Sequence, residues 1–234
     1  MTGKMMLELH EVTQELKQWR HGKLVLLKGK SKQFCSGGDL KNFMNYLKTP
    51  ELGYMMSCFM HYTMKDFSKL PMSTIALIEG QTLGGGAEIT TACDYRLMEK
   101  SASIGFVQSK LGITPGWGGA TRLSQIVGSR NAMELLLSGR RLSPNDAIQL
   151  QLVDKTFDGN REDQEDAVDF AIQWVEENGL LSLSPSLTQE ICKLMKEGKP
   201  NQDKSFQSER ELFGRVWQGN EHLSALSKKI KHRK

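Results

Sequence analysis

The stretch that most constrains this chain is the glycine-rich segment 80–88, which follows the apolar run 73–78 and precedes a helical pattern. Three consecutive glycines at 84–86 leave backbone N–H groups open to a ligand, because no Cβ atom stands in the way. The positive end of the following helix points to the same place. The segment is therefore either a plain turn that ends a strand and begins a helix, or a site for an oxygen that gains negative charge.

A second glycine-bearing junction lies earlier in the chain. The apolar residues 23–28 are typical of a buried strand, and residues 35–39, with the sequence Cys-Ser-Gly-Gly-Asp, lead from it toward a helix. The order strand, glycine turn, helix thus occurs twice, which indicates a layered α/β fold. Each junction supplies one outward N–H group, and two such groups that converge on a carbonyl oxygen form an oxyanion hole.

Hydrophobic periodicity predicts the remaining elements. Helices are expected over 5–19, 51–70, 84–92, 119–126, 128–138 and from 144, and strands over 23–28, 73–78, 94–98 and 153–157. From residue 161 onward the pattern is helical without a strand signal. The sequence therefore predicts a core over residues 1–160 and a separate helical region over residues 161–234.

Composition narrows the class of protein. A net charge of +4 over 234 residues is too mild to favour a nucleic-acid partner, and no apolar run approaches the length of a membrane span. The basic run 228–234 is either a solvated tail or a contact for a phosphorylated ligand. Four widely spaced cysteines indicate neither a metal site nor a disulfide framework, and no signal-peptide pattern follows Met1. We therefore expect a cytosolic protein without a metal.

Three segments together resemble the signatures of the enoyl-CoA hydratase/isomerase (crotonase) family. They are residues 34–40, 84–88 and 111–119, and they occur in the family's order and spacing. The resemblance extends from Met5 to the C-terminus. Within the family, the turn that contains Trp117 and the segments 91–98 and 209–217 are most similar to a branch that decarboxylates ethylmalonyl-CoA.

The resemblance implies a fold. Family members form a spiral of repeated strand-strand-helix units, and C-terminal helices mediate the formation of a homotrimer or a dimer of trimers. Members usually begin with two strands and an Asn-Pro turn before the helix that here starts near Met5. We therefore expect those N-terminal strands to be missing. Either the chain is truncated or its other helices and partner subunits cover the exposed sheet edges.

The resemblance also implies a site. The N–H groups of Ser36 and Gly85 would hold the thioester carbonyl of an acyl-CoA, and Glu88 would match the first catalytic glutamate of the hydratases. The second hydratase glutamate falls on Gln108, and Trp117 stands where hydratases have a small residue. The residues implied to bind the substrate are Gly37, Gly38, Asp39, Gly84, Gly86, Gln108, Gly116 and Trp117.

These departures disfavour hydration, because an amide such as Gln108 neither activates water nor delivers a proton by ionising. The resemblance instead implies decarboxylation of a short branched 2-carboxyacyl-CoA, ethylmalonyl-CoA better than methylmalonyl-CoA, through a thioester enolate. The acyl-CoA is the expected partner and no further cofactor is expected. Two alternatives remain open: an enoyl-CoA isomerase that uses a single glutamate, and a non-catalytic acyl-CoA-binding protein.

Glu88 is the least settled residue of the predicted site, because an ionised carboxylate would repel the carboxylate of the substrate. Burial would keep it partly protonated, so that it donates a proton to the α-carbon after CO2 has left. Otherwise it is angled away from the leaving CO2. A third interpretation gives it no chemistry and lets it brace the glycine turn.

Overall fold

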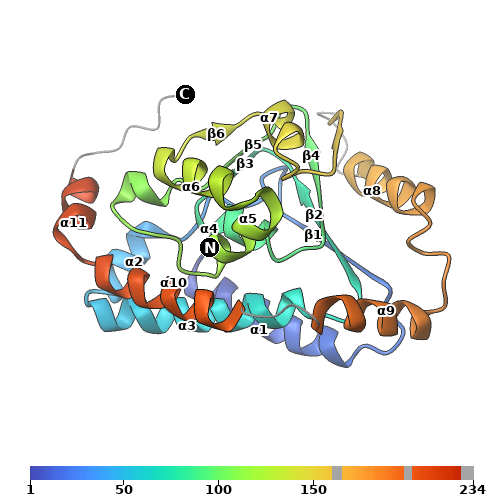
Figure 1. Ribbon diagram of the computed structural model, residues 1–234, viewed down its shortest axis with the longest axis horizontal. Coiled ribbons are helices and arrows are strands. Elements are labelled where there is room, and N and C mark those ends of the chain that lie inside the picture. The colour runs from blue at the N-terminus through green and yellow to red at the C-terminus, as the bar shows by residue number, and fades with distance from the viewer. Residues whose placement is uncertain (160–164, 198–201, 228–234) are drawn as a thin grey trace.

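The computed structural model describes residues 1–159, 165–197 and 202–227. Helices surround two small β-sheets that lie near the middle of the molecule (Figure 1). The predicted α/β class is therefore confirmed. The basic run 228–234 and the predicted boundary between residues 160 and 161 lie outside the described residues.

The larger sheet is parallel and has the strand order β1-β2-β4-β7. Its central strand β2 alternates Ile75 and Leu77 on one face with Ala76 and Ile78 on the other, and all four side chains are fully buried. A strand that is buried on both faces reads as one apolar run, which is why the sequence predicted it. The strands are β1 (Leu24–Lys28), β2 (Ser73–Ile78), β4 (Tyr95–Glu99) and β7 (Lys155–Phe157).

The smaller sheet was not predicted from sequence periodicity. Its strands, in the order β3-β5-β6, are β3 (Gln81–Leu83), β5 (Ser103–Gly105) and β6 (Arg141–Leu142). The sequence analysis expected a glycine turn between the strand over 73–78 and the helix from residue 84, and it did not predict β3 within that turn. Strands of two or three residues are too short to show an alternating pattern.

The chain crosses repeatedly from the larger sheet to the smaller sheet before it enters a helix. The chain passes from β2 through β3 to α4, and from β4 through β5 to the short helix η1. The first turn follows the same path, because Cys35 forms a parallel bridge with Thr82 of β3. Parallel neighbours end at the same edge of a sheet, so the glycine turns after Cys35 and after β3 are brought together.

The helices lie where hydrophobic periodicity placed them, with shifts of a few residues at their ends. Ser143 and Asp146 form a reciprocal capping box at the start of α7, the helix that was predicted to begin at residue 144. The helices are α1 (Gly3–Gln18), α2 (Leu40–Tyr46), α3 (Pro50–Ser68), α4 (Gly85–Thr90), η1 (Gln108–Leu111), α5 (Gly119–Val127), α6 (Ser129–Ser138), α7 (Pro144–Gln149), α8 (Glu165–Glu177), α9 (Pro185–Glu197), α10 (Gln202–Val216) and α11 (Asn220–Ser227).

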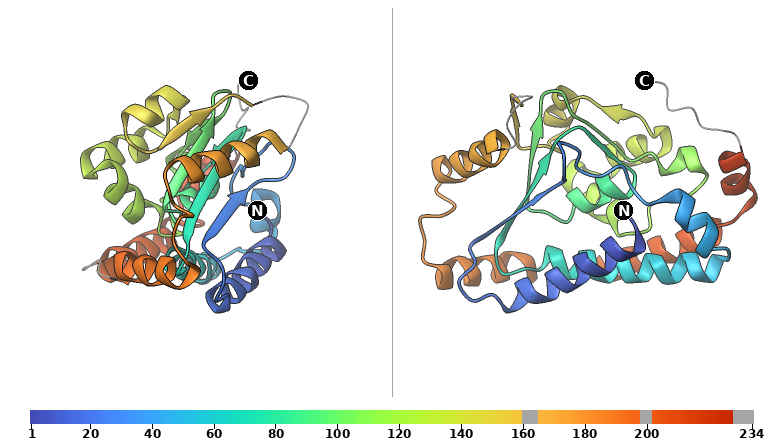
Figure 2. Two further views of the ribbon diagram at one scale, coloured as in Figure 1. Left: turned by 90° about the vertical axis from the view of Figure 1, so that its right-hand side faces the viewer. Right: turned by 180° about the vertical axis from the view of Figure 1, so that it is seen from behind.

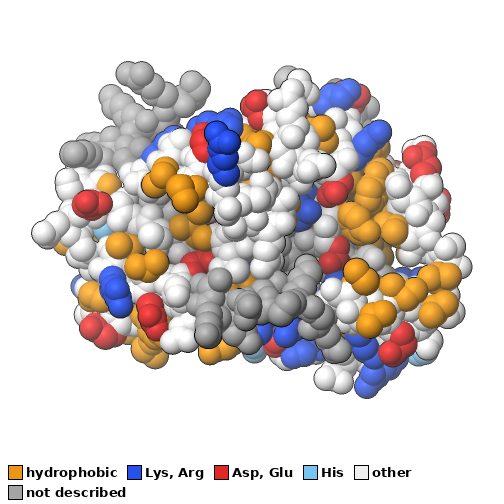
Figure 3. Space-filling model, viewed as in Figure 1, with side chains coloured by type: hydrophobic (Ala, Val, Ile, Leu, Met, Phe, Trp, Pro, Cys, Tyr) orange, Lys and Arg blue, Asp and Glu red, His pale blue; other side chains and the backbone are white. Residues whose placement is uncertain are grey.

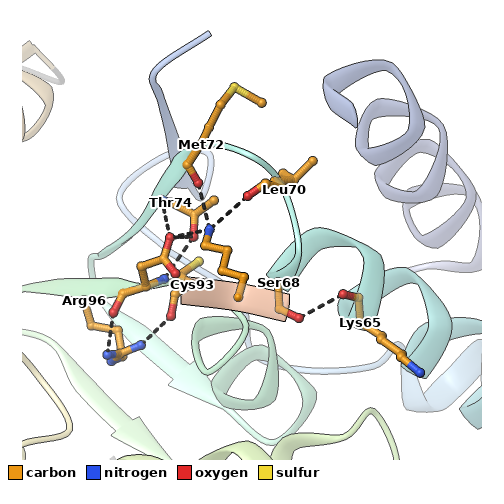
Figure 4. Close-up of polar contacts among 9 residues, drawn as sticks. Lys65, Ser68, Leu70, Met72, Thr74, Cys93 and Arg96 are labelled. Carbon is orange, nitrogen blue, oxygen red and sulfur yellow. Dashed lines mark hydrogen bonds and ion pairs between the residues drawn. The ribbon is translucent and has the colours of Figure 1, made fainter. Parts of the chain in front are cut away.

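The C-terminal helices return to the core. α10 packs along α3 beneath the sheets (Figure 2). α9 is fastened by Lys196, whose Nζ donates to the carbonyl oxygens of Leu70 at 3.1 Å and Met72 at 2.7 Å and pairs with Asp94 at 2.7 Å (Figure 4). The helical C-terminal region is present as predicted, yet it shares its packing with the core.

One outward face of α9 is apolar. Hydrophobic side chains gather at the lower right of the space-filling view, over this helix (Figure 3). Leu187, Ile191, Leu194 and Met195 are each more than two-fifths exposed. Their spacing places them on one side of the helix. The helices in the described ranges include none that is both long and apolar enough to span a bilayer.

Candidate active site

The glycine turn that follows Cys35 lies next to the glycine turn that follows β3. The N–H of Leu83 donates to the carbonyl of Cys35 at 3.0 Å, and a Cβ atom added to Gly37 would lie 3.5 Å from the nitrogen of Gly85. Within the described chain, the N–H groups of Ser36 and Gly85 donate to no other protein group. The structure thus places both N–H groups in neighbouring turns with their hydrogen-bonding capacity unused.

These turns border a mostly apolar cavity of about 80 Å³. Segments from both glycine turns, from α3, from η1 and its flanks, and from α10 contribute to its wall. The lining residues are Ser36, Gly37, Gly38, Leu40, Phe43, Met56, Gly84, Gly85, Glu88, Val107, Gln108, Leu111, Ile113, Trp117, Phe213 and Trp217.

Most of the residues predicted for the site line this cavity, but three do not. Asp39 caps α2, where its carboxylate accepts from the N–H of Asn42 at 3.2 Å. Gly86 lies against the carbonyl of Cys35 with no room for a side chain, and the carbonyl of Gly116 accepts from the Ser57 hydroxyl at 2.6 Å. The role of these three residues in substrate binding stays a prediction.

Glu88 lies in the first turn of α4, and its two carboxyl oxygens have different partners. Oε2 accepts from the backbone N–H groups of Trp117 at 2.8 Å and Gly119 at 3.0 Å. Oε1 accepts from Nε2 of Gln108 at 2.7 Å. Glu88 therefore braces the glycine turn that contains Trp117 and Gly119 rather than the turn at 84–86. Its Oε1 lies beside Gln108, which also lines the cavity.

Burial gives Glu88 an unusual proton affinity. Its side chain is 2 % exposed, and desolvation together with the nearby carboxylate of Glu209 raises the pKa of Glu88 to about 7. The N–H groups of Trp117 and Gly119 and the Arg122 guanidinium act in the opposite direction. At neutral pH the carboxyl group is thus present in both protonation states.

Arg122 and Glu209 form a buried polar network behind Glu88, and sequence reasoning missed both. The Arg122 guanidinium donates to the carbonyl of Trp117 at 2.7 Å and to the Thr91 hydroxyl at 3.0 Å. The Glu209 carboxylate accepts from both the N–H and the hydroxyl of Thr121, each at 3.0 Å. The resemblance over residues 209–217 was a usable signal, but it was used only to identify the branch of the family, and no site residue was predicted from it.

The apolar wall was also only partly predicted. Trp117 packs against Gly85, where an added methyl group would overlap the indole ring, and its Nε1–H points to the sulfur of Met56 at 3.2 Å. Phe213 lies in α10, and Trp217 directly follows the end of that helix. The methionines of α3 have different surroundings, because Met56 lines the cavity whereas Met60 and Met64 pack in the core.

The arrangement combines two unused backbone donors, one carboxyl group with a neutral form near pH 7, and mostly apolar walls. Such a site stabilises negative charge on one oxygen and moves one proton. Among the described residues, no three His, Cys, Asp or Glu side chains are grouped to hold a metal ion.

Comparison with known proteins shows which family this chain matches. The enoyl-CoA hydratase/isomerase family matches residues 1–226. Ethylmalonyl-CoA decarboxylase of Xenopus laevis is 39% identical over 233 residues, which cover 99% of this chain and 76% of the frog protein. The proteins of the same name from Danio rerio and Homo sapiens are 40% and 37% identical, over 76% and 75% of their lengths.

Solved structures are similar over almost the whole chain. An enoyl-CoA hydratase/isomerase from Xanthobacter autotrophicus Py2 superposes with a TM-score of 0.84 over 96% of this chain and 82% of its own, at 20% identity. An enoyl-CoA hydratase from Bacillus anthracis gives a TM-score of 0.73 at 27% identity, over 97% of this chain and 86% of its own. The predicted crotonase-like spiral is thereby confirmed.

Proposed function

This chain belongs to the enoyl-CoA hydratase/isomerase family, and we propose that it is a carboxy-lyase that decarboxylates ethylmalonyl-CoA to butyryl-CoA and CO2. Relatives with the name ethylmalonyl-CoA decarboxylase are 37% to 40% identical over nearly the whole chain. The observation that carries the proposal is the pair of unused N–H groups on Ser36 and Gly85 beside a carboxyl group that is partly neutral at pH 7. Methylmalonyl-CoA is the proposed poorer substrate.

The first step breaks the bond between the α-carbon and the carboxylate. The electron pair of that bond moves into the thioester, which becomes an enolate, and neutral CO2 leaves. The N–H groups of Ser36 and Gly85 hold the enolate oxygen. Removing one donor of a preorganised pair of this kind costs about 3 kcal/mol of barrier in other enzymes. The apolar wall around Trp117 favours loss of charge from the carboxylate.

The second step returns a proton to the α-carbon. Glu88 donates it, so that its own carboxyl group becomes a carboxylate, and the solvent later restores the proton. The reaction consumes one proton for each CO2 released. Burial and Glu209 raise the pKa of Glu88 to about 7, which keeps a neutral donor available under ordinary conditions.

Gln108 separates this reaction from hydration. Hydration needs one group to activate water and a second to protonate carbon, whereas the amide of Gln108 holds Glu88 at 2.7 Å and does not ionise. Decarboxylation needs only one proton donor. The same residue that removes the hydratase reaction is therefore compatible with a carboxy-lyase.

The test is to supply purified protein with ethylmalonyl-CoA, methylmalonyl-CoA, crotonyl-CoA and 3-hexenoyl-CoA in separate reactions. CO2 release and product mass are measured. We expect butyryl-CoA from the first, slower turnover of the second, and neither hydration of the third nor double-bond migration in the fourth. Turnover of crotonyl-CoA or 3-hexenoyl-CoA without CO2 release from the first would overturn the proposal.

Assembly, cofactor use and compartment are part of the same proposal. We propose a homotrimer or a dimer of trimers, supported by the apolar outward face of α9 at Leu187, Ile191, Leu194 and Met195. We also propose that no cofactor other than the CoA of the substrate is needed, and that the protein works in the cytosol. Light scattering, activity after treatment with a chelator, and cell fractionation test these three statements separately.

A further inference from the structure

The side chain of Gln108 is hydrogen-bonded at one end only. Its Nε2 donates to Oε1 of Glu88 at 2.7 Å, while its own Oε1 is enclosed and has no hydrogen-bond partner among the described residues. The residue is 5 % exposed and lines the cavity. An enclosed amide oxygen without a donor is unfavourable. The outer end of this amide is therefore unpaired, in a residue that lines the cavity.

The two ends of this amide exchange by a half-turn about its terminal bond. When Glu88 is ionised it only accepts, so Nε2 of Gln108 faces it and the amide oxygen faces away. When Glu88 carries a proton on Oε1, the amide oxygen accepts that proton and Nε2 faces away. The outer end of Gln108 is thus an acceptor beside ionised Glu88 and a donor beside neutral Glu88.

The neighbours of Glu88 fix which oxygen takes the proton. Oε2 is occupied by the N–H groups of Trp117 and Gly119, so Oε1 is left for the proton and for Gln108. The charged groups nearby are Arg122 of α5, which lies behind the site, and Glu209 of α10. Neither lines the cavity, so neither is placed to contact a ligand there.

The cavity wall contains few other donors for an anionic ligand. None of the described lining residues is Lys, Arg or His. The indole N–H of Trp117 points to the sulfur of Met56, and that of Trp217 donates to the carbonyl of Leu47 at 2.9 Å. The backbone N–H groups of Ser36 and Gly85 are assigned to the thioester oxygen. The side-chain donors that remain for another ligand group are the amide of Gln108 and the hydroxyl of Ser36.

We propose that Gln108 recognises the carboxylate of the substrate, and that it does so only while Glu88 holds a proton. A carboxylate accepts hydrogen bonds and donates none, so it fits the amide only in the orientation that neutral Glu88 selects. This inference rests on the proposed function, because it takes a 2-carboxyacyl-CoA as the substrate. Substrate binding then places on Glu88 the proton that the α-carbon later receives.

The coupling has a thermodynamic consequence. A ligand that binds only the protonated form draws a proton from solvent whenever the free site is ionised. The pKa of Glu88, raised to about 7 by burial and by Glu209, places that uptake just above neutral pH. The affinity for a carboxylated ligand is therefore expected to fall about tenfold for each pH unit above that value.

Two thioether probes test the proposal without turnover. The first is 2-carboxybutyl-CoA, which keeps the carboxylate but lacks the thioester carbonyl and forms no enolate; the second is butyl-CoA, which lacks both. Calorimetric titration in buffers with different ionisation enthalpies counts the protons taken up. At about pH 8 we expect the wild-type protein to take up nearly one proton with the carboxylated probe and none with butyl-CoA.

The variant Gln108→Leu removes both hydrogen-bonding ends of the amide. We expect it to bind 2-carboxybutyl-CoA roughly tenfold or more weakly, with clearly less proton uptake than the wild type because only charge repulsion by Glu88 remains, and to bind butyl-CoA as the wild type does. The matched control is Leu111→Ala on the same short helix, which is expected to weaken both probes alike and leave the proton count unchanged.

Two outcomes contradict the inference. One is a Gln108→Leu protein that binds 2-carboxybutyl-CoA with wild-type affinity and proton uptake. The other is loss of the preference for the carboxylated probe in Ser36→Ala but not in Gln108→Leu. If wild-type protein releases CO2 from ethylmalonyl-CoA but shows no coupling to Gln108, only this inference fails. If it shows the coupling but releases no CO2, only the proposed function fails.

Discussion

The two sides of the cavity are made of different material. On one side, which we call the backbone side, the N–H groups of Ser36 and Gly85 come from glycine turns aligned by two parallel neighbours of a sheet. On the other, the carboxyl side, Glu88 and Gln108 present side chains that are almost completely buried. Backbone N–H groups do not titrate and stay hydrogen-bond donors at every ordinary pH. The charge of the carboxyl side, in contrast, changes with the protonation of Glu88 and with single substitutions. We therefore expect substitutions on the two sides to change the reaction in different ways.

The largest expected effect is a steric change on the backbone side. In Gly85→Ala the new methyl group overlaps the ring of Trp117, so the N–H group and the indole must move apart. We expect kcat for ethylmalonyl-CoA to fall by about 10² to 10³, as for loss of an oxyanion-hole donor. Rates of CO2 release measure this.

A matched substitution controls for the methyl group itself. Gly3 begins α1 and has nothing within 4 Å of an added Cβ atom, so Gly3→Ala should keep wild-type kcat. Thermal unfolding shows whether Gly85→Ala is folded. A folded Gly85→Ala protein with wild-type kcat would remove the backbone side from the account.

A smaller effect is expected on the carboxyl side. Glu88→Gln keeps an acceptor for the N–H groups of Trp117 and Gly119 but removes the proton donor. We expect kcat to fall by about 10², because general acid catalysis supplies that order of rate. A wild-type rate in this variant would leave Glu88 with only its bracing role.

The pH dependence separates the two sides further. The donor is the neutral form of Glu88, so the fraction that can react is complete below the pKa of about 7 and falls as the pH rises through it. For the wild type, kcat/KM should therefore be level below that value and decline about tenfold per pH unit above it. Glu88→Gln should lack this decline, and a profile shared by both proteins would contradict the assignment.

The smallest expected effect comes from replacing Glu209, which lies behind the site and does not line the cavity. The Glu209 carboxylate raises the pKa of Glu88, so Glu209→Gln should move the decline in kcat/KM to lower pH without abolishing activity. The amide oxygen of the new side chain still accepts from Thr121, which keeps the start of α5 capped. An unchanged pH profile would show that Glu209 serves α5 alone.

Sequence reasoning located the backbone side better than the carboxyl side for a physical reason. Glycine turns at the ends of apolar runs are local features, so both junctions were predicted to supply an N–H group, and the family resemblance then implied Ser36 and Gly85 as the two donors. Their proximity depends on the short strand β3, which is too brief to predict from periodicity. The family resemblance supplied the spiral that brings them together.

The carboxyl side depends on contacts between distant parts of the chain. Glu88 and Gln108 were identified, but the N–H groups of Trp117 and Gly119 that hold Glu88 lie about thirty residues away, and Glu209 lies more than a hundred residues away. No local pattern reports such contacts. Phe213 and Trp217 were also missed, since the C-terminal helical region was expected to serve assembly rather than the cavity.

The most direct test of these separate roles for the backbone side and the carboxyl side measures where deuterium enters the product. Decarboxylation in D2O places one deuterium on the α-carbon of butyryl-CoA, and the configuration of that carbon reports which face received it. We predict a single configuration from the wild-type protein and a mixture of both from Glu88→Gln, because the enolate held by Ser36 and Gly85 is then quenched by solvent. The same single configuration from both proteins would contradict the assignment of Glu88 as the proton donor.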